Sequence, residues 1–351
     1  MNGDAVGSVR RDEEGALDDA AEGEASPALD AVLARLGRRL LVPLLLALVA
    51  VAALALYADG RELARRLGEF DLALLVPVLA LSLVNYALRF VRWHLYLLRL
   101  DASPGWVDSL WIFLFGFVLT VTPGKVGELG KAWLVRELEG GRGRDGIAAV
   151  MAERITDIVG VLVLICLGTL AFPGLAAVAW TGLVVTLALT ALLAWPRSVD
   201  LLAALLLRIP VLRDRARILV EMHHALGRLL RPGLLVAALM LSIVAWGAEG
   251  LGFALVVSSY TGETTWLAGL FDYSVGSMAG GLAMLPGGLV AAEGTLTALL
   301  VARGVDAAAA ASATLIIRAA TLWFAFLLGL GAMPLLWMRL RRRRATERGR
   351  R

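Results

Sequence analysis

Long apolar runs with few charges recur along the whole chain, and they constrain its fold more than any other feature. The first run, residues 40–58, contains no charged residue and is long enough to cross the hydrocarbon core of a bilayer as a helix. Of the 351 residues, 59% are hydrophobic and only 18% are charged, whereas soluble domains carry about 25% charged residues. Because a segment in lipid has to satisfy its own backbone hydrogen bonds, runs of this kind predict an all-α, polytopic membrane protein.

The positions of the arginines predict how these runs are oriented. Basic segments favour the cytoplasmic side; three arginines directly precede the first run and eight crowd residues 339–351. Residues 123–146 and 196–232 are also basic, so we expect both inside and residues 59–71 as the first outer loop. Six full spans follow from this arrangement: 40–58, 72–98, two within 147–196 that turn at Phe172-Pro173-Gly174, 233–258 and 308–338.

Two further apolar stretches begin and end on one side of the membrane. Residues 110–121 lie between a span that ends inside and a segment that is inside, and they have about half the length of a span. Residues 268–304 begin and end outside and contain Pro286, Gly287 and Gly288 in their middle. We therefore expect two re-entrant hairpins, or pairs of short helices, in addition to the spans.

The order of helix, broken hairpin and charged helix occurs twice along the chain. The first unit comprises residues 72–98, 107–139 and 147–172, and the second comprises 233–258, 268–304 and 308–338. In each unit a hairpin glutamate precedes an arginine in the last helix by a similar separation, 26 positions from Glu128 to Arg154 and 25 from Glu293 to Arg318. Since the first unit starts inside and the second outside, the pattern predicts an inverted repeat, in which broken segments are typical of a transporter's central site.

The ends of the chain differ from its apolar part in composition. Residues 1–34 are acidic and contain little that could form a core, so we expect a disordered cytoplasmic tail. Residues 35–338 are the predicted transmembrane domain, and residues 339–351 are a basic cytoplasmic tail that contacts anionic lipid rather than nucleic acid. The expected location is the plasma membrane, and the sequence indicates no oligomeric state.

The densest polar window is residues 122–131. Only two of the 34 basic residues are lysines, and both lie here. A proline ends the preceding helix, and glycines allow backbone N–H groups to approach an anion at a helix start. The alternative is an interfacial loop whose lysines extend to water. The candidate substrate-binding residues are Lys125, Glu128 and Lys131, with backbone turns at Pro123, Gly124 and Gly127.

A second group of charges, Glu153, Arg154 and Asp157, lies at the inner end of an apolar helix. Glu153 and Asp157 are one turn apart, and Asp157 is within reach of Arg154. Charges at membrane depth normally point into the bundle and find partners. The group is therefore interpreted either as an internal salt bridge that fixes helix packing or as a site where Arg154 binds a phosphate.

The third group combines the turn at Pro286, Gly287 and Gly288 with Glu293 and Arg318. Arg318 is the only charged residue between positions 307 and 338, so it needs a buried partner. Glu293, Glu249 and Asp272 are the candidates for that partner. The pair either binds substrate or only sets helix register.

Two more arginines, Arg89 and Arg92, lie with Asn85 on one face toward the inner end of the second span. Such residues are more often head-group anchors than ligands, and we interpret them as anchors.

The sequence offers little support for catalysis or for a cofactor. His94, His223 and His224 lack partners at zinc-ligand spacing, and the single Cys166 lies in an apolar run. The sequence contains no Walker loop, dinucleotide fingerprint or nucleophile–base pattern. We therefore expect no metal, no cofactor and no enzymatic activity from this chain alone.

Taken together, four motifs in this order resemble the lysylphosphatidylglycerol synthase transmembrane-region family, also described as flippase-like integral membrane proteins. The motifs are Pro123-Gly124 with Gly127-Glu128, Glu153-Arg154 with Asp157, Pro286-Gly287-Gly288 with Glu293-Gly294, and Arg318. The resemblance covers roughly residues 40–338. It implies a helical domain with re-entrant segments, associated in its best-known members with moving aminoacylated phosphatidylglycerol between leaflets, while other members occur beside lipid-linked sugar or isoprenoid pathways.

The resemblance carries over to individual positions. Glu128, Arg154, Glu293 and Arg318 match the family's motif charges, and Gly124, Gly127, Gly287 and Gly288 match its turns. Lys131 stands where an arginine often follows the first glutamate, and the chain has no soluble transferase domain.

We therefore expect a lipid flippase that moves a phospholipid or lipid-linked anionic substrate. The alternatives are a membrane subunit or accessory of a lipid-modifying transferase, with such an enzyme as partner, and a scaffold that recruits an enzyme through residues 196–232.

Overall fold

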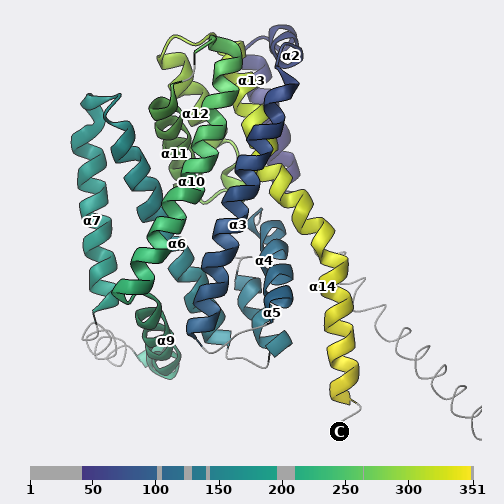
Figure 1. The fold of residues 1–351 in the computed structure, drawn as a ribbon, viewed down its shortest axis with the longest axis vertical. Helices are drawn as coiled ribbons and strands as arrows, with labels where there is room; N and C mark the ends of the chain where they lie inside the picture. The colour runs from purple at the N-terminus through teal and green to yellow at the C-terminus, as the bar shows by residue number, and fades with distance from the viewer. Residues whose placement is uncertain are drawn as a thin grey trace, which may run out of the picture. The chain divides into compact units, whose positions relative to one another are not determined.

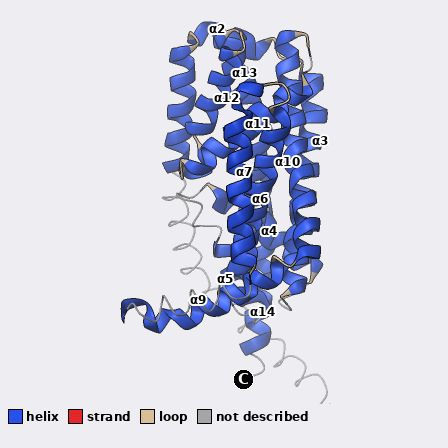
Figure 2. Ribbon diagram, turned by 90° about the vertical axis from the view of Figure 1, so that its left-hand side faces the viewer, coloured by secondary structure: helices blue, strands red, loops and turns tan. Residues whose placement is uncertain are grey.

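The computed structural model describes residues 42–100, 105–121, 129–139, 143–195, 210–263 and 265–348. The chain divides into two units, Met1–Leu45 and Leu46–Arg351. In the first unit, residues 42–45 are described, and they are helical. The predicted acidic tail, residues 1–34, lies outside the described residues. The described residues of the unit Leu46–Arg351 form helices and no strand (Figures 1 and 2).

Four helices in the described residues are long and apolar enough to cross a membrane. They are η1–α3 (Leu72–Arg99), η3–α7 (Pro173–Ala194), α10 (Pro232–Thr261) and the segment Ala307–Arg342 of the continuous helix α13–η5–α14. Pro173 and Pro232 stand in the first turn of their helices, where the missing N–H group breaks no helical bond. The prediction of a polytopic helical membrane protein is confirmed.

The two other expected spans depart from a plain apolar helix. The first is a bent pair, in which Val42–Tyr57 is followed by α2 (Gly60–Gly68) at an angle of 102°. Residues 59–71, expected as a loop, therefore contain a helix whose Arg65 and Arg66 pair with Glu62 and Glu69. The second is α6 (Gly143–Gly168), which has the length of a span but carries buried charges.

Short helices occupy the two stretches that were expected to be re-entrant. The first stretch contains α4 (Trp106–Thr120) and α5 (Leu129–Glu139), and both lie in the lower half of Figure 1. The second contains α11 (Trp266–Leu282), the turn η4 (Pro286–Gly288) and α12 (Ala291–Ala302), and α11 and α12 lie in the upper half. The two short-helix groups therefore occupy opposite ends of the bundle.

The basic segments also form helices. Helix α9 (Pro210–Leu229) lies across the lower end of the long helices (Figure 2). The last helix consists of α13 (Ala307–Arg318), the π-helical turn η5 (Ala319–Trp323) and α14 (Phe324–Arg348). It continues ten residues beyond the predicted end at position 338, through the arginine-rich tail.

The long helices approach closely where side chains are small. Helices α3 and α10 are joined by a hydrogen bond of 2.8 Å from Asn85 Nδ2 to the carbonyl oxygen of Ala245. A methyl group at Gly269 would lie only 2.5 Å from Cβ of Ala254, so α11 packs against α10 at a distance that glycine alone permits. Small residues at helix contacts are typical of membrane bundles, in which association depends on close packing.

Candidate functional site

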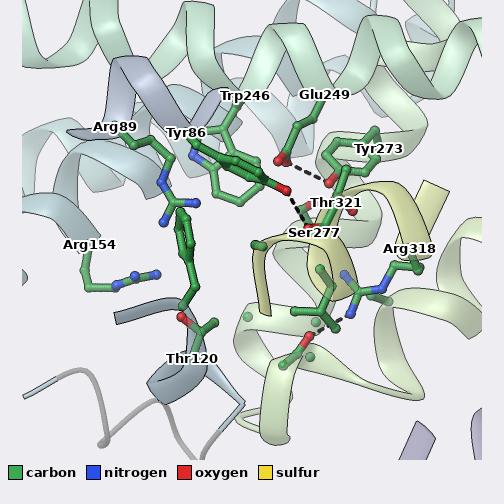
Figure 3. Close-up of a pocket in the computed structure, with 18 residues that line it drawn as sticks. Tyr86, Arg89, Thr120, Arg154, Trp246, Glu249, Tyr273, Ser277, Arg318 and Thr321 are labelled. Carbon is green, nitrogen blue, oxygen red and sulfur yellow. Dashed lines mark hydrogen bonds between the residues drawn. The ribbon is translucent and has the colours of Figure 1, made fainter. Parts of the chain in front are cut away.

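A cavity of about 100 Å³ lies inside the bundle, between the two groups of short helices (Figure 3). Residues of α3, α4, α6, α10, α11, η4, α12, α13, η5 and α14 line it. Many of the side chains that line it are polar. Six of them are titratable: Tyr86, Arg89, Arg154, Glu249, Tyr273 and Arg318.

Three arginines reach the cavity from three different helices. In Figure 3, Arg89 of α3 and Arg154 of α6 extend from the left and Arg318 of α13 from the right. Arginine presents a planar set of N–H donors that matches phosphate and carboxylate geometry. A cavity with cations on opposite sides is suited to hold an anion.

Arg318 is held by the broken segment of the second hairpin. Its Nε donates to Glu293 Oε1 at 2.6 Å, and its NH2 donates to the carbonyl oxygen of Gly287 at 2.7 Å. Of the three partners considered from the sequence, Glu293 is therefore the one that pairs with Arg318. Asp272 pairs with Arg303 instead, and Glu249 accepts a hydrogen bond from Tyr273.

The backbone of that broken segment is constrained. Gly287 and Gly288 have φ values of 62° and 67°, in the left-handed region where side chains are disfavoured. The non-glycine residues Met284 and Val290 on either side also have positive φ values of 53° and 72°. Left-handed conformations of this kind cluster at ligand sites, because surrounding contacts have to hold them in place.

The Arg89 guanidinium lies beside two aromatic rings. Its guanidinium carbon lies 6.0 Å from the centre of the Phe117 ring and 5.7 Å from that of Trp246. Within the described residues no carboxylate lies at salt-bridge distance from it. The interpretation of Arg89, Arg92 and Asn85 as head-group anchors is therefore wrong: Asn85 and Arg92 are fully buried, and Arg89 faces the cavity.

Glu249 is the acidic residue that lines the cavity. It is 5% exposed, and its Oε2 accepts a hydrogen bond of 2.7 Å from the Tyr273 hydroxyl. We considered it from the sequence only as a partner for Arg318. A signal for a larger role was present, because Glu249 is the only charged residue between positions 233 and 258.

The π-helical turn η5 forms part of the wall, through Thr321 and Leu322. The Tyr86 hydroxyl donates to the carbonyl oxygen of Thr321 at 2.6 Å. Isolated π-helical turns inside α-helices occur frequently at functional sites, because they redirect side chains and free carbonyl groups. This turn follows Arg318 directly in the chain.

Asp157 belongs to a buried network beside the cavity. Its Oδ1 is 2.7 Å from Arg92 NH2, and it accepts hydrogen bonds from Ser242 at 3.1 Å and Trp246 at 3.0 Å. The partner of Asp157 is thus on α3 rather than on its own helix. This arrangement fits the packing interpretation for Asp157, whereas the neighbouring Arg154 faces the cavity.

Lys131 and Glu153 form a second buried pair. The Lys131 Nζ is 2.6 Å from Glu153 Oε2 and 4.0 Å from the centre of the Trp93 ring. Neither residue is among those that line the cavity. The structure therefore brings Arg154 and Arg318 to one cavity and holds Lys131, Glu153 and Asp157 in interhelical contacts around it.

The remaining predicted site residues lie outside the described residues. They are Pro123, Gly124, Lys125, Gly127 and Glu128.

No group of three or more His, Cys, Asp or Glu side chains that could hold a metal ion occurs in the described ranges.

Fold and cavity together define the class: a polytopic helical membrane protein with a charged cavity at its centre. The model of the family "Lysylphosphatidylglycerol synthase TM region" matches residues 41–329. The chain therefore belongs to this family, which confirms the resemblance, and it is a membrane domain of a lipid-related family. No curated protein and no solved structure matches the chain.

Proposed function

We propose that the protein moves an anionic lipid between the two leaflets of the membrane and that Arg89, Arg154 and Arg318 bind its phosphate. The observation that carries this proposal is the cavity into which three helices each extend an arginine. Charge-assisted hydrogen bonds from guanidinium groups to phosphate are among the strongest available to a protein, and low polarity strengthens them further.

The size of the cavity is suited to the charged part of a lipid. A water molecule requires about 10–15 Å³, so a cavity of about 100 Å³ has room for several waters or for a phosphate group. Movement of a lipid between the leaflets further requires the surrounding helices to move around this site, as in alternating access.

An inverted repeat would allow this movement, because one unit can move against the other. Two contacts support the presence of such a repeat. Asn85 and its hydrogen-bond partner Ala245 are 160 positions apart, which is also the separation between Tyr86 and Trp246. Tyr86 of the first unit contacts Thr321 in the last helix of the second. Trp246 of the second unit contacts Asp157 in the last helix of the first. Tyr86 and Trp246 thus occupy equivalent positions in the two units, and each contacts the last helix of the other unit. Two units related by a two-fold axis would make such a pair of contacts.

We further propose a plasma-membrane location with both termini in the cytoplasm, on the basis of the arginine-rich segments. We propose no enzymatic activity for this chain itself. A role as the membrane subunit of a lipid-modifying transferase is the competing hypothesis.

The test is leaflet exchange of fluorescent phosphatidylglycerol in liposomes that contain the purified protein. Arg154→Gln and Arg318→Gln should each slow the exchange at least tenfold, because each removes a cation from the cavity. Arg61→Gln is the matched control, since Arg61 is exposed on α2 and does not line the cavity. Unchanged exchange in both cavity variants would contradict the assigned site, and no exchange by folded wild-type protein would favour the transferase-subunit role.

A further inference from the structure

We propose that Glu249 binds a proton when the cavity takes up an anionic head group, so that lipid movement is coupled to proton movement. This inference rests on the proposed function and adds the coupling ion to it. The proton comes from the water on the side where the lipid enters, forms an O–H bond with the carboxylate of Glu249, and leaves to the water on the opposite side.

The first argument is that Glu249 has no basic side chain within salt-bridge distance among the described residues. Five other acidic residues are buried in the described part of the chain, and each has a basic side chain within salt-bridge distance. These pairs are Asp145 with Arg228, Glu153 with Lys131, Asp157 with Arg92, Asp272 with Arg303, and Glu293 with Arg318. Glu249 instead has the hydroxyl group of Tyr273 as its hydrogen-bond donor.

The second argument is the position of Glu249. A carboxylate that is buried without a paired cation is costly to keep ionised, and taking up a proton removes that cost. Ionisable residues inside membrane bundles that line cavities are typical of proton pathways. Glu249 lies in the interior of α10 and lines the cavity, so its proton can exchange with whatever occupies that space.

The third argument is the charge around Glu249. The charged and titratable groups that line the same cavity or interact electrostatically with Glu249 are Tyr273 from α11, Tyr86 and Arg89 from α3, Arg154 and Asp157 from α6, and Arg318 from α13. In the empty cavity the charges of Arg89 and Arg318 offset part of the cost of keeping Glu249 ionised. A bound phosphodiester neutralises part of that positive charge and adds a negative charge nearby. Proton uptake by Glu249 is then favoured.

Thermodynamic linkage makes this coupling reciprocal. If phosphate binding increases the proton affinity of Glu249, protonation increases the affinity for phosphate by the same factor. One phosphodiester and one proton together also leave the net charge of the cavity unchanged. The loaded cavity can therefore pass between its two orientations at no greater electrostatic cost than the empty one.

The experiment uses full-length protein in liposomes with fluorescent phosphatidylglycerol and an imposed pH gradient. The wild-type protein should accumulate the lipid in the leaflet that faces the alkaline side. For one proton per lipid, a gradient of one pH unit sustains a leaflet ratio of up to about tenfold. A pH-sensitive dye inside the liposomes should report proton movement that requires the lipid.

Glu249→Gln should abolish this accumulation, because an amide cannot take up the proton, and the leaflet ratio should stay near one at every gradient. Asp272→Asn is the matched control: it neutralises another buried acid, on the adjacent helix α11, that does not line the cavity. This control should keep the gradient-driven ratio. Accumulation that persists in Glu249→Gln would overturn the proposal.

Tyr273→Phe covers the case in which Glu249→Gln does not fold. It removes only the donor to Glu249, so the ionised carboxylate is less stabilised and accumulation should begin at higher pH than in the wild type. An unchanged pH dependence would overturn the assignment to Glu249. Wild-type exchange without any effect of the gradient would overturn proton coupling and leave the flippase proposal standing, whereas no exchange at all would overturn the proposed function.

Discussion

The hydroxyl group of Tyr86 donates a hydrogen bond of 2.6 Å to the carbonyl oxygen of Thr321, inside the π-helical turn of the last helix. This bond joins α3 to the last helix at the wall of the cavity. Because Thr321 lies three positions after Arg318 in the same helix, the bond also helps to fix where that arginine points.

Replacing Tyr86 by Phe should therefore lower the free energy of unfolding by about 0.5–1.5 kcal/mol, since it removes one buried hydrogen bond to a carbonyl group that also accepts from the backbone N–H of Phe324. Lipid exchange should slow as well. Thermal unfolding in detergent and the liposome assay measure the two effects. Tyr57→Phe, at a position 58% exposed, is the control and should change neither.

The Arg318–Glu293 pair allows binding to be separated from packing. Arg318→Gln leaves Glu293 buried without a cation, which should cost about 3–5 kcal/mol in unfolding free energy. The double variant Arg318→Gln with Glu293→Gln should recover most of that stability, because no uncompensated charge remains. Its lipid exchange should stay low if Arg318 binds phosphate. Recovery of both stability and exchange would show that the pair only sets helix register.

Arg89 and Arg92 lie three residues apart on α3 and should respond differently to the same change. Arg89→Gln should slow lipid exchange at least tenfold and change the unfolding free energy by less than about 1 kcal/mol, because Arg89 has no ion pair among the described residues. Arg92→Gln should destabilise the protein by about 3–5 kcal/mol, since it leaves Asp157 buried without its cation. Equal effects on stability would contradict the different roles assigned to them.

The turn before α12 should not accept a side chain. A methyl group at Gly288 would lie 3.0 Å from the Cα of Gly280, on a backbone with φ of 67°. Gly288→Ala should lower the melting temperature and impair exchange, because the carbonyl of the adjacent Gly287 holds Arg318. Gly294→Ala provides the comparison: Gly294 has open space around it inside α12, and alanine should be neutral or stabilise the helix by up to about 1 kcal/mol.

Much of the fold could be predicted from the sequence because membrane helices are encoded locally. The apolar runs of α3, α7, α10 and α13–α14 and the two short-helix stretches are visible as hydropathy and as Pro/Gly interruptions. The end of the last helix was placed too early, because arginines mark the membrane boundary but do not stop a helix.

The candidate site was harder to predict because it depends on pairing between distant helices. Arg154 was selected as one of a group of charges at membrane depth and Arg318 as an isolated charge, and both line the cavity. The partner of Asp157 was missed, since Arg92 is far away in the chain and only the crossing of α3 and α6 brings them together. Arg89 was assigned to the interface because a linear sequence does not show how deep a residue near a helix end lies.

The π-helical turn η5 places one more residue between the two ends of the last helix than a plain α-helix would. A π-turn bonds each N–H group to the carbonyl five residues earlier instead of four, so it holds an extra residue while the helices on either side keep their register. Deleting one residue from Ala319–Trp323 should therefore change the wall of the cavity but leave α14 packed against α4, with Gly329 still beside the carbonyl of Leu114. In a set of homologous sequences, this short uncharged stretch is accordingly where a one-residue gap should be compatible with the rest of the last helix.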